Sequence, residues 1–362
     1  MKKAALVLMF LMVFTFTGFG QVIPGIIYPA DGLTYFGKDV GVVGSFSTFI
    51  GWKSGQQSQG DYNAFFGGSS GINNNGSWNV FCGNQSGFNN KGSMNVFSGY
   101  QSGYFNQGSW NVFYGSQSGF SNTTGNYNVF NGFQSGVSNT TGTGNIFIGA
   151  NSGHSNRTGS HNVFSGYQSG FTNSIGSYNV FSGYQSGYTN TTGSGNVFLG
   201  YSAGYSETGS NRLYIDNSNT TTPLIYGKFD TNQVGINTTN IPIGFAFAVK
   251  GKVITEEINI ALQGSAIWPD YVFNDDYKLP SLKEVEKHII ENGHLQNIPS
   301  AAEVSESGIF LGAMNVKLLQ KIEELTLYSI QQQKELEYLK AENENYKSFA
   351  TRLSALEKEL KK

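Results

Sequence analysis

The sequence has 362 residues and a formal net charge of −2, so it lacks the excess of basic residues that nucleic-acid binding requires. Its 48 glycines come with an aromatic fraction of 14%, which a disordered chain does not have. The single cysteine, Cys82, cannot support an intramolecular disulfide or a zinc site built of thiolates, and we interpret it as a small apolar filler. Composition therefore indicates an ordered, glycine-rich protein with little charge.

The first 20 residues have the pattern of a secretory signal peptide. Lys2 and Lys3 precede the apolar run AALVLMFLMVFTF, and small residues follow before Gln21. The run has 13 residues, fewer than a transmembrane helix needs. We expect cleavage before Gln21, export across the inner membrane to the cell surface or the exterior, and no membrane span in the mature chain. Residues 21–46 are expected to form a lead-in segment.

A repeat occupies the next part of the chain. The phrase NVFSGYQSG begins at Asn95, Asn162 and Asn179 and contains no charged residue. Each unit opens with Asn and an apolar run of two to four residues, which suits a short strand and is too short for a helix. A degenerate first unit is expected at Leu33. The units recur every 16 and then every 17 residues, and they open at Asn63, Asn79, Asn95, Asn111, Asn128, Asn145, Asn162, Asn179 and Asn196.

The repeat predicts a parallel β-solenoid (β-roll) over residues 47–215. Two fixed glycine columns indicate two corners per unit, which leaves room for two short strands in each coil. Ten coils stacked about 4.8 Å apart give a rod of about 48 Å. Neighbouring Val and Phe residues point to opposite faces of their strand, so one fills the interior and the other forms an exposed apolar stripe. A homotrimer would bury that stripe.

This pattern resembles the heads of trimeric autotransporter adhesins, in which short Asn-Ser-Val-Ala-Ile-Gly-type repeats form a trimeric left-handed parallel β-roll. It is also similar to repeats of secreted bacterial tail-fibre-like proteins. The resemblance covers roughly residues 33–215. The present repeat is longer than that of the adhesins, and an aromatic residue replaces the small Ala. The resemblance implies a trimeric fibre.

The repeat array lacks the residues of most catalytic sites. Between Tyr62 and Ser206 only Lys91 and Arg157 are charged, so the acidic pair of a glycoside hydrolase and the repeated Asp of calcium-binding solenoids are both missing. His154 and His161 occupy different columns, and we interpret them as substitutes for aromatic residues rather than metal ligands. We expect no catalytic residue, no cofactor and no metal.

The aromatic residues admit two interpretations. They pack on each other along the rod, which we favour, or their exposed members stack on sugar rings of a glycan or contact another cell-surface ligand. Under the second interpretation the ligand-contact candidates are Tyr100, Tyr104, Trp110, Tyr167, Tyr184 and Tyr188.

Beyond the repeats the composition changes. Residues 216–267 are rich in β-branched and aromatic residues broken by Asn, Thr and Gly, and they predict a β-rich neck of hairpins, one of them with its turn in VKGKV. Residues 268–314 predict a small α+β module, in which Ser281 with Glu284 and Ser300 with Glu303 form capping boxes. The stretch from Trp268 resembles the C-terminal module of secreted tail-fibre-like proteins. It is more distantly similar to the intramolecular chaperone domain of phage tail spikes and endosialidases. The resemblance implies a trimerisation and folding element, here without the residues of self-cleavage.

Residues 315–362 predict an α-helical coiled coil about 70 Å long. Such a helix cannot bury its apolar seam alone, so the chain is expected to oligomerise. One core column is Asn315, Ile322, Ser329, Leu336, Asn343, Ala350 and Glu357, and the other is Leu318, Leu325, Gln332, Leu339, Tyr346, Leu353 and Leu360.

Three functions remain open from the sequence. The favoured one is a non-enzymatic, exported, homotrimeric fibre that acts in adhesion or surface display, with the rod as shaft and contact surface. The second is a phage-derived, tail-fibre-like receptor-binding protein, against which the signal peptide argues. The third is a polysaccharide-acting enzyme on a β-helix, against which the scarcity of acidic residues in the rod argues.

Overall fold

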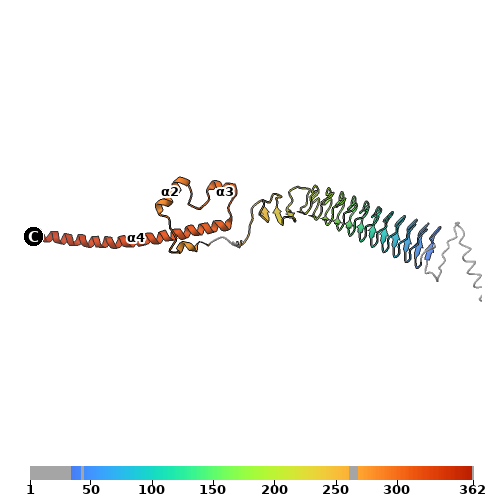
Figure 1. Ribbon diagram of the computed structural model, residues 1–362, viewed down its shortest axis with the longest axis horizontal. Helices are drawn as coiled ribbons and strands as arrows, with labels where there is room; N and C mark the ends of the chain where they lie inside the picture. Colours follow the sequence, from blue (N-terminus) through green and yellow to red (C-terminus); the bar gives the residue numbers. More distant parts are fainter. Residues whose placement is uncertain (1–33, 42–44, 261–267, 361–362) are drawn as a thin grey trace, which may run out of the picture. The chain divides into compact units, whose positions relative to one another are not determined.

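The computed structural model describes residues 34–41, 45–260 and 268–360 (Figure 1). These residues form two compact units that divide between Val253 and Ile254. The signal peptide predicted at residues 1–20 lies outside the described residues. Among the described residues, no helix has the length and hydropathy to cross a membrane.

The first unit is a stack of short parallel strands, one above the next along the chain (Figure 1). The strands pair so that the same repeat position meets in successive coils, as Val96 meets Val112 and Phe97 meets Phe113. The stack consists of β1 (Thr34–Phe36), β2 (Thr48–Ile50), β3 (Ala64–Phe66), β4 (Val80–Cys82), β5 (Val96–Ser98), β6 (Val112–Tyr114), β7 (Val129–Asn131), β8 (Ile146–Ile148), β9 (Val163–Ser165), β10 (Val180–Ser182), β11 (Val197–Leu199) and β12 (Arg212–Ile215). The parallel β-solenoid is thus confirmed.

Each coil of the rod contains one strand, so the expectation of two strands per coil is wrong. The rest of the coil is a series of turns, because non-glycine residues with positive φ recur in it, as at Gln101 (φ 54°) and Trp110 (φ 57°). Glycine is required where the backbone passes too close to a buried ring or to the next coil to leave room for a Cβ atom. A Cβ on Gly103 (φ 61°) would overlap the ring of Phe97, and one on Gly99 would overlap the backbone of Gly115 in the next coil.

Phenylalanine fills the interior of the rod. Ring centroids in successive coils lie 4.7 to 5.0 Å apart. Full burial of one such side chain stabilises the fold by about 1.5–3 kcal/mol. The residues of this column are all fully buried: Phe49, Phe65, Phe81, Phe97, Phe113, Phe130, Phe147, Phe164, Phe181 and Phe198. Of the two faces left open by the sequence, the Phe face lies inside and the Val face outside.

Two columns of buried asparagine satisfy the polar backbone of the interior. The opening Asn95 donates its side-chain amide to the Gly108 carbonyl at 3.0 Å and accepts the Asn111 backbone N–H at 2.9 Å. A second column, eleven residues further on, forms a chain of amide hydrogen bonds. Within it Asn106 donates to Asn90 at 2.7 Å, and Asn122 donates to Asn106 at 2.6 Å. The sequence analysis did not single out this second column.

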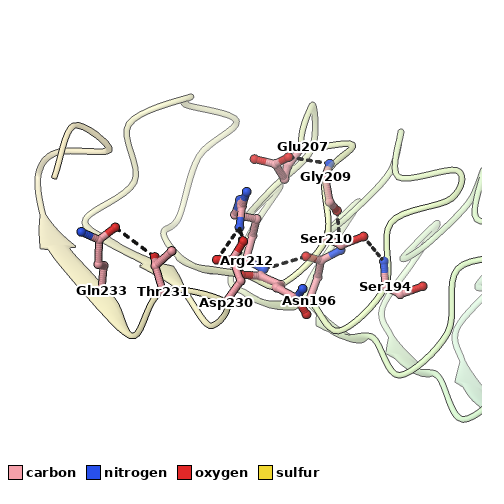
Figure 2. A network of polar contacts seen from close by, with 10 residues as sticks. Ser194, Asn196, Glu207, Gly209, Ser210, Arg212, Asp230, Thr231 and Gln233 are labelled. Carbon is pink, nitrogen blue, oxygen red and sulfur yellow. Dashed lines mark hydrogen bonds and ion pairs between the residues drawn. The ribbon is translucent and has the colours of Figure 1, made fainter. Parts of the chain in front are cut away.

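The rod ends where charged residues replace the repeat (Figure 2). Arg212 stands at the position of the opening Asn. Its backbone N–H donates to Asn196 at 2.8 Å, and its guanidinium pairs with Asp230 at 3.2 Å. Glu207 ends the second asparagine column and accepts the Gly209 N–H at 2.6 Å. The last strand of the rod is not left open at this end, because residues 225–228 pair antiparallel with it.

The neck continues the sheet with β13 (Ile225–Lys228), β14 (Gln233–Ile236) and β15 (Phe247–Val249). Strands β12, β13 and β14 pair antiparallel, as the hairpin pattern predicts. The expected hairpin turn in VKGKV is wrong, because β15 pairs parallel with β14 and no strand follows it among residues 250–260.

The second unit is helical, with η1 (Pro269–Phe273), α2 (Leu282–Asn292), α3 (Ala301–Ser307) and α4 (Leu311–Leu360). The α+β module expected at residues 268–314 is wrong in its β part, because these residues form helices and turns and contain no strand. Both predicted capping boxes are confirmed, at Ser281 with Glu284 and at Ser300 with Glu303. Gly293 ends α2 in the left-handed conformation (φ 75°).

Few polar contacts hold the helical unit together. The Tyr277 hydroxyl donates to Glu324 at 2.6 Å, and Lys321 pairs with the same carboxylate at 2.8 Å. Burial and the bond to Glu324 raise the pKa of Tyr277 to about 12. Burial alone would raise the pKa of Glu324, but hydrogen bonds from Lys321, Tyr277 and Gln320 outweigh it and hold that pKa below 4.5.

Candidate ligand-contact surface of the rod

We call the outward-pointing side chains of the rod's strands its strand face. Val129 on β7 and Ile146 on β8 point outward there, whereas the residues that follow them, Phe130 and Phe147, are fully buried. The exposed Cys82 lies on the same face, in β4. Alternation along each short strand therefore leaves a band of partly exposed apolar side chains along the rod.

Three further columns of aromatic residues lie partly exposed on the rod. The lead column precedes each opening Asn, the corner column follows the first glycine, and the turn column follows the second glycine. The aromatic members of the lead column are Phe46, Tyr62, Trp78, Trp110, Tyr127 and Tyr178. Those of the corner column are Trp52, Tyr100, Phe133, Tyr167, Tyr184 and Tyr201, and those of the turn column are Phe88, Tyr104, Phe120, Phe171, Tyr188 and Tyr205.

The six predicted ligand-contact residues do not come together in one site. Trp110 belongs to the lead column, whereas Tyr100, Tyr167 and Tyr184 belong to the corner column. Tyr104 and Tyr188 belong to the turn column and are only half-exposed. They occupy three separate columns, so a ligand that touched all of them would have to cover most of the rod's circumference.

Stacking covers the ring faces of three of these candidates. Tyr104 lies between Phe88 and Phe120, with centroids 4.8 and 5.1 Å away. Tyr184 lies between Tyr167 and Tyr201 at 5.4 and 5.2 Å. Tyr188 likewise lies between Phe171 and Tyr205, at 5.1 and 4.9 Å. A sugar stacks on a ring face, and these rings offer the solvent their edges.

The other three candidates keep ring surface in the open. Trp110 stacks on Tyr127 at 5.0 Å, and Met94 occupies the same column in the preceding coil. Tyr167 stacks on Tyr184, and Ala150 stands in the preceding coil. In the neighbouring coils of the corner column, Asn84 precedes Tyr100 and Ser116 follows it.

The two histidines of the rod take the places of aromatic residues, as the sequence predicts. His154 stacks on Phe171 at 4.8 Å, and His161 stacks on Tyr178 at 5.3 Å. Burial lowers the pKa of His154, which favours its neutral form. No group of three or more His, Cys, Asp or Glu residues suited to a metal occurs within the described ranges.

A groove on the early coils was not found from the sequence. It has a volume of about 640 Å³, and we call it the amide groove. Residues on both sides of the second asparagine column line it: Gln57, Gln59, Asn73, Asn75, Asn89, Lys91, Phe105 and Gln107. The signal in the sequence is the recurrence of QSQ, NNN, NNK and FNQ at 16-residue intervals, in which the middle residue is buried and the outer two face outward.

Comparison with known proteins finds no matching family, no curated relative and no matching solved structure. The function of the chain is therefore argued from its own residues and geometry.

Proposed function

We propose that the protein is an exported, non-enzymatic, homotrimeric fibre that acts in adhesion or surface display. The repeat rod is its shaft and contact surface, and the helical unit joins the chains through a coiled coil. The observation that carries the proposal is the large apolar surface that a single chain leaves exposed in both units. Export follows from the signal peptide pattern, and the choice of three chains follows from the resemblance to adhesin heads.

The helix α4 supplies the first argument for self-association. It is one continuous helix of 50 residues, and both heptad columns predicted from the sequence lie on it. Its large apolar heptad residues are exposed in the single chain: Leu318, Ile322, Leu325, Leu336, Leu339, Tyr346, Leu353 and Leu360. An isolated helix of this kind is unstable in water unless other helices cover the seam.

The cavity between α2 and α4 supplies a second argument. It measures about 420 Å³ and is lined chiefly by apolar side chains, among them Leu282, Val285, Leu318 and Leu325. Leu318 and Leu325 also belong to the heptad seam. The seam is therefore continuous with an apolar hollow, as expected of a helical unit that is completed by other copies of itself.

The strand face of the rod supplies a third argument, drawn from the first unit. Val or Ile stands at the first position of each strand from β4 to β11, while the third position is apolar in some strands, as at Ile148, and polar in others, as at Ser165. Charge is nearly missing from the repeats, where Lys91 and Arg157 are the two ionised residues between Tyr62 and Ser206. A long apolar face without charge is suited to pairing with copies of itself. The same scarcity of ionisable groups is why we assign the rod no catalytic role.

Sedimentation equilibrium of the mature chain tests the assembly. We expect a mass of three chains, and a monomer at micromolar concentration would overturn the proposal. The exposed thiol of Cys82 then reports on the strand face. It should react slowly with a maleimide in the assembly and rapidly after dissociation. In the matched control, Asn75→Cys in a Cys82→Ser background, the thiol lies in the amide groove and should react rapidly in both states.

Attachment of the purified protein to intact cells tests adhesion. Fluorescently labelled mature chain is expected to bind saturably to a cell surface, and unlabelled protein is expected to compete. If no binding to any tested cell surface is observed while the trimer is intact, the adhesion part of the proposal is lost and surface display remains. Release of reducing sugars from any polysaccharide would instead establish an enzyme.

A further inference from the structure

We propose that the amide groove binds an acidic oligosaccharide strand that lies along the rod. This inference deepens the adhesion proposal above, because it names the contact surface and the class of ligand. It rests on the shape of the groove, its hydrogen-bonding side chains, one exposed ring and one cation.

The shape of the groove fits an extended chain. Its walls are two columns of outward-pointing side chains, and in the chain these columns flank the buried Ser58, Asn74, Asn90 and Asn106. It crosses four coils, which gives a length of about 14 Å at the coil spacing. Its volume of about 640 Å³ lies within the usual range of ligand sites.

The walls offer a regular set of amides. An amide both donates and accepts hydrogen bonds, and so do the hydroxyls of a sugar. Asn73 donates to Asn89 at 2.8 Å, which holds these two side chains in line along the groove before any ligand arrives. Gln57, Asn75 and Gln107 are exposed around them. A side chain that is already ordered loses less conformational entropy when it binds.

Phe105 gives the groove an aromatic surface that the stacked columns do not have. Its ring is nearly perpendicular to those of Tyr104 and Phe120, at 79° and 84°, with centroids 4.6 and 5.3 Å away. Because Phe88 and Phe120 cover the faces of Tyr104, Phe105 meets the edges of this stack. Its plane therefore runs along the rod, and the residue is 43% exposed. A sugar ring in the groove can lie against it.

Lys91 favours a negatively charged ligand. It is the one ionised side chain among the residues that line the groove, and it is exposed. No carboxylate stands among those lining residues to neutralise it. A carboxylate or sulfate on the glycan would form a charge-assisted hydrogen bond with this ammonium group. The groove therefore favours an acidic oligosaccharide over a neutral one of the same length.

The groove lies across the interior from the strand face. The opening Asn79, next to β4, reaches the second asparagine column, where its side-chain amide donates to Asn74 at 3.4 Å. Asn74 lies in the chain between Asn73 and Asn75, which both line the groove. Self-association through the strand face would therefore leave the groove open to solvent.

The groove is confined to the coils of 16 residues. From Asn111 to Asn196 each coil has one more residue, and Ser121 and Thr123 stand where the earlier coils carry an amide, Lys91 or Phe105. The Thr123 hydroxyl donates to the Thr140 carbonyl at 2.8 Å and is occupied along the rod. The longer coils therefore provide a natural comparison within the same chain.

Binding of the full mature trimer to immobilised oligogalacturonate, oligomannuronate and heparin-derived oligosaccharides tests the inference. The same uronates with their carboxyl groups reduced to alcohols serve as neutral counterparts. We expect binding to at least one acidic oligomer, weaker at high salt, with affinity reduced about tenfold or more by Lys91→Gln and by Phe105→Ala. Asn75→Asp should abolish it by repulsion.

Matched controls leave the groove untouched. Arg157→Gln removes the other cation between Tyr62 and Ser206, and Asn84→Asp adds a charge at an exposed corner position on the same coil as Lys91. Both should bind as the unchanged protein does, and all variants should sediment as trimers. Equal loss in the controls, equal binding of the reduced oligomers, or no binding of any acidic oligomer would overturn the inference. Cell attachment and trimer mass would still report separately on the proposed function.

Discussion

The rod and the helical unit solve the problem of burial in opposite ways. In the rod each coil covers the one before it, so that Phe130 is fully buried between Phe113 and Phe147 within a single chain. In the helical unit the largest helix, α4, leaves Leu336 and Leu339 exposed. A repeat that stacks on itself is completed along the chain, whereas an amphipathic helix of this length needs other helices. The rod is therefore expected to be stable alone, and the helical unit only in an assembly.

The largest effect is expected from introducing charged residues into the apolar heptad seam of α4, because this tests whether the helical unit depends on other copies of the chain. Leu325→Asp together with Leu339→Asp should abolish the proposed trimer, because an unpaired carboxylate is costly to bury in the core of the proposed coiled coil. Sedimentation should give a monomer, and circular dichroism at 222 nm should show loss of the helical signal while the β signal remains. Ala341→Asp, at the heptad position opposite the seam, is the matched control. If the double variant stayed trimeric, the seam would not be the interface.

Removal of one ring from the interior should damage the rod next most strongly. Phe130→Ala is expected to cost about 3–5 kcal/mol, because it leaves a cavity between two stacked neighbours. Val129→Ala, one residue earlier on the outward face, is the control and should cost far less. Chemical denaturation followed by the β signal measures both. Similar losses in the two variants would show that the outward column is buried as fully as the inner one in the assembly.

The second asparagine column allows single buried hydrogen bonds of the rod to be tested. Asn122 donates to Asn106 at 2.6 Å and to the Gly125 carbonyl at 2.8 Å, and it accepts from Asn139 at 2.6 Å. Asn122→Ala should cost about 1–3 kcal/mol for each buried partner left unpaired. Asn126→Ala, four residues on and partly exposed, is the comparison, and denaturant midpoints measure the difference. An effect no larger than that of Asn126→Ala would mean that water replaces the lost amide.

The polar contacts of the helical unit should give the smallest effect, and one that depends on pH. The pKa of Glu324 is held below 4.5, so its contribution is present above pH 4.5 and is lost as the pH falls through the lowered pKa. The pKa of Tyr277 is raised to about 12, so its contribution is present below pH 10 and is lost as the pH rises toward 12.

Glu324→Gln tests this dependence in the full chain. At pH 7 it should lower the stability of the helical unit by about 1–2 kcal/mol, because Gln keeps the shape but loses the charge-assisted bonds. The difference between the two proteins in thermal unfolding should shrink at acid pH. Glu344→Gln, in an exposed pair with Lys347, should change little at any pH. A difference that did not vary with pH would show that the Glu324 carboxylate has no such role.

Local patterns in the sequence predict several elements well. Glycine at fixed positions and a short apolar run predict coils of short strands with one face buried, because neighbouring Val and Phe residues point to opposite faces of a strand. Ser281 and Ser300 predict two helix starts, since each capping box lies within four residues. The hairpin expected in VKGKV failed because β15 instead pairs parallel with β14, a choice that depends on the neck around it.

The candidate site was harder to predict. Whether a ring is a platform or a packing element depends on its neighbours in the coils above and below, 16 or 17 residues away. Tyr184 and Phe105 are both exposed aromatic residues in the sequence pattern, yet Tyr184 is stacked on both sides and Phe105 stands across its neighbours. To predict the groove from the sequence, one would also have to know that the side chains of Asn74 and Asn90 point inward.

By itself the sequence determined the repeat, its coil length, the near absence of charge and the long heptad helix, because these are periodicities that neighbouring residues carry. Only the tertiary structure decided that the Phe column lies inside and the Val column outside. It also decided that a second asparagine column is buried and that a groove of amides with one open ring runs over the early coils. These features depend on the contact of one coil with the next, and such contacts join residues that are distant in the chain.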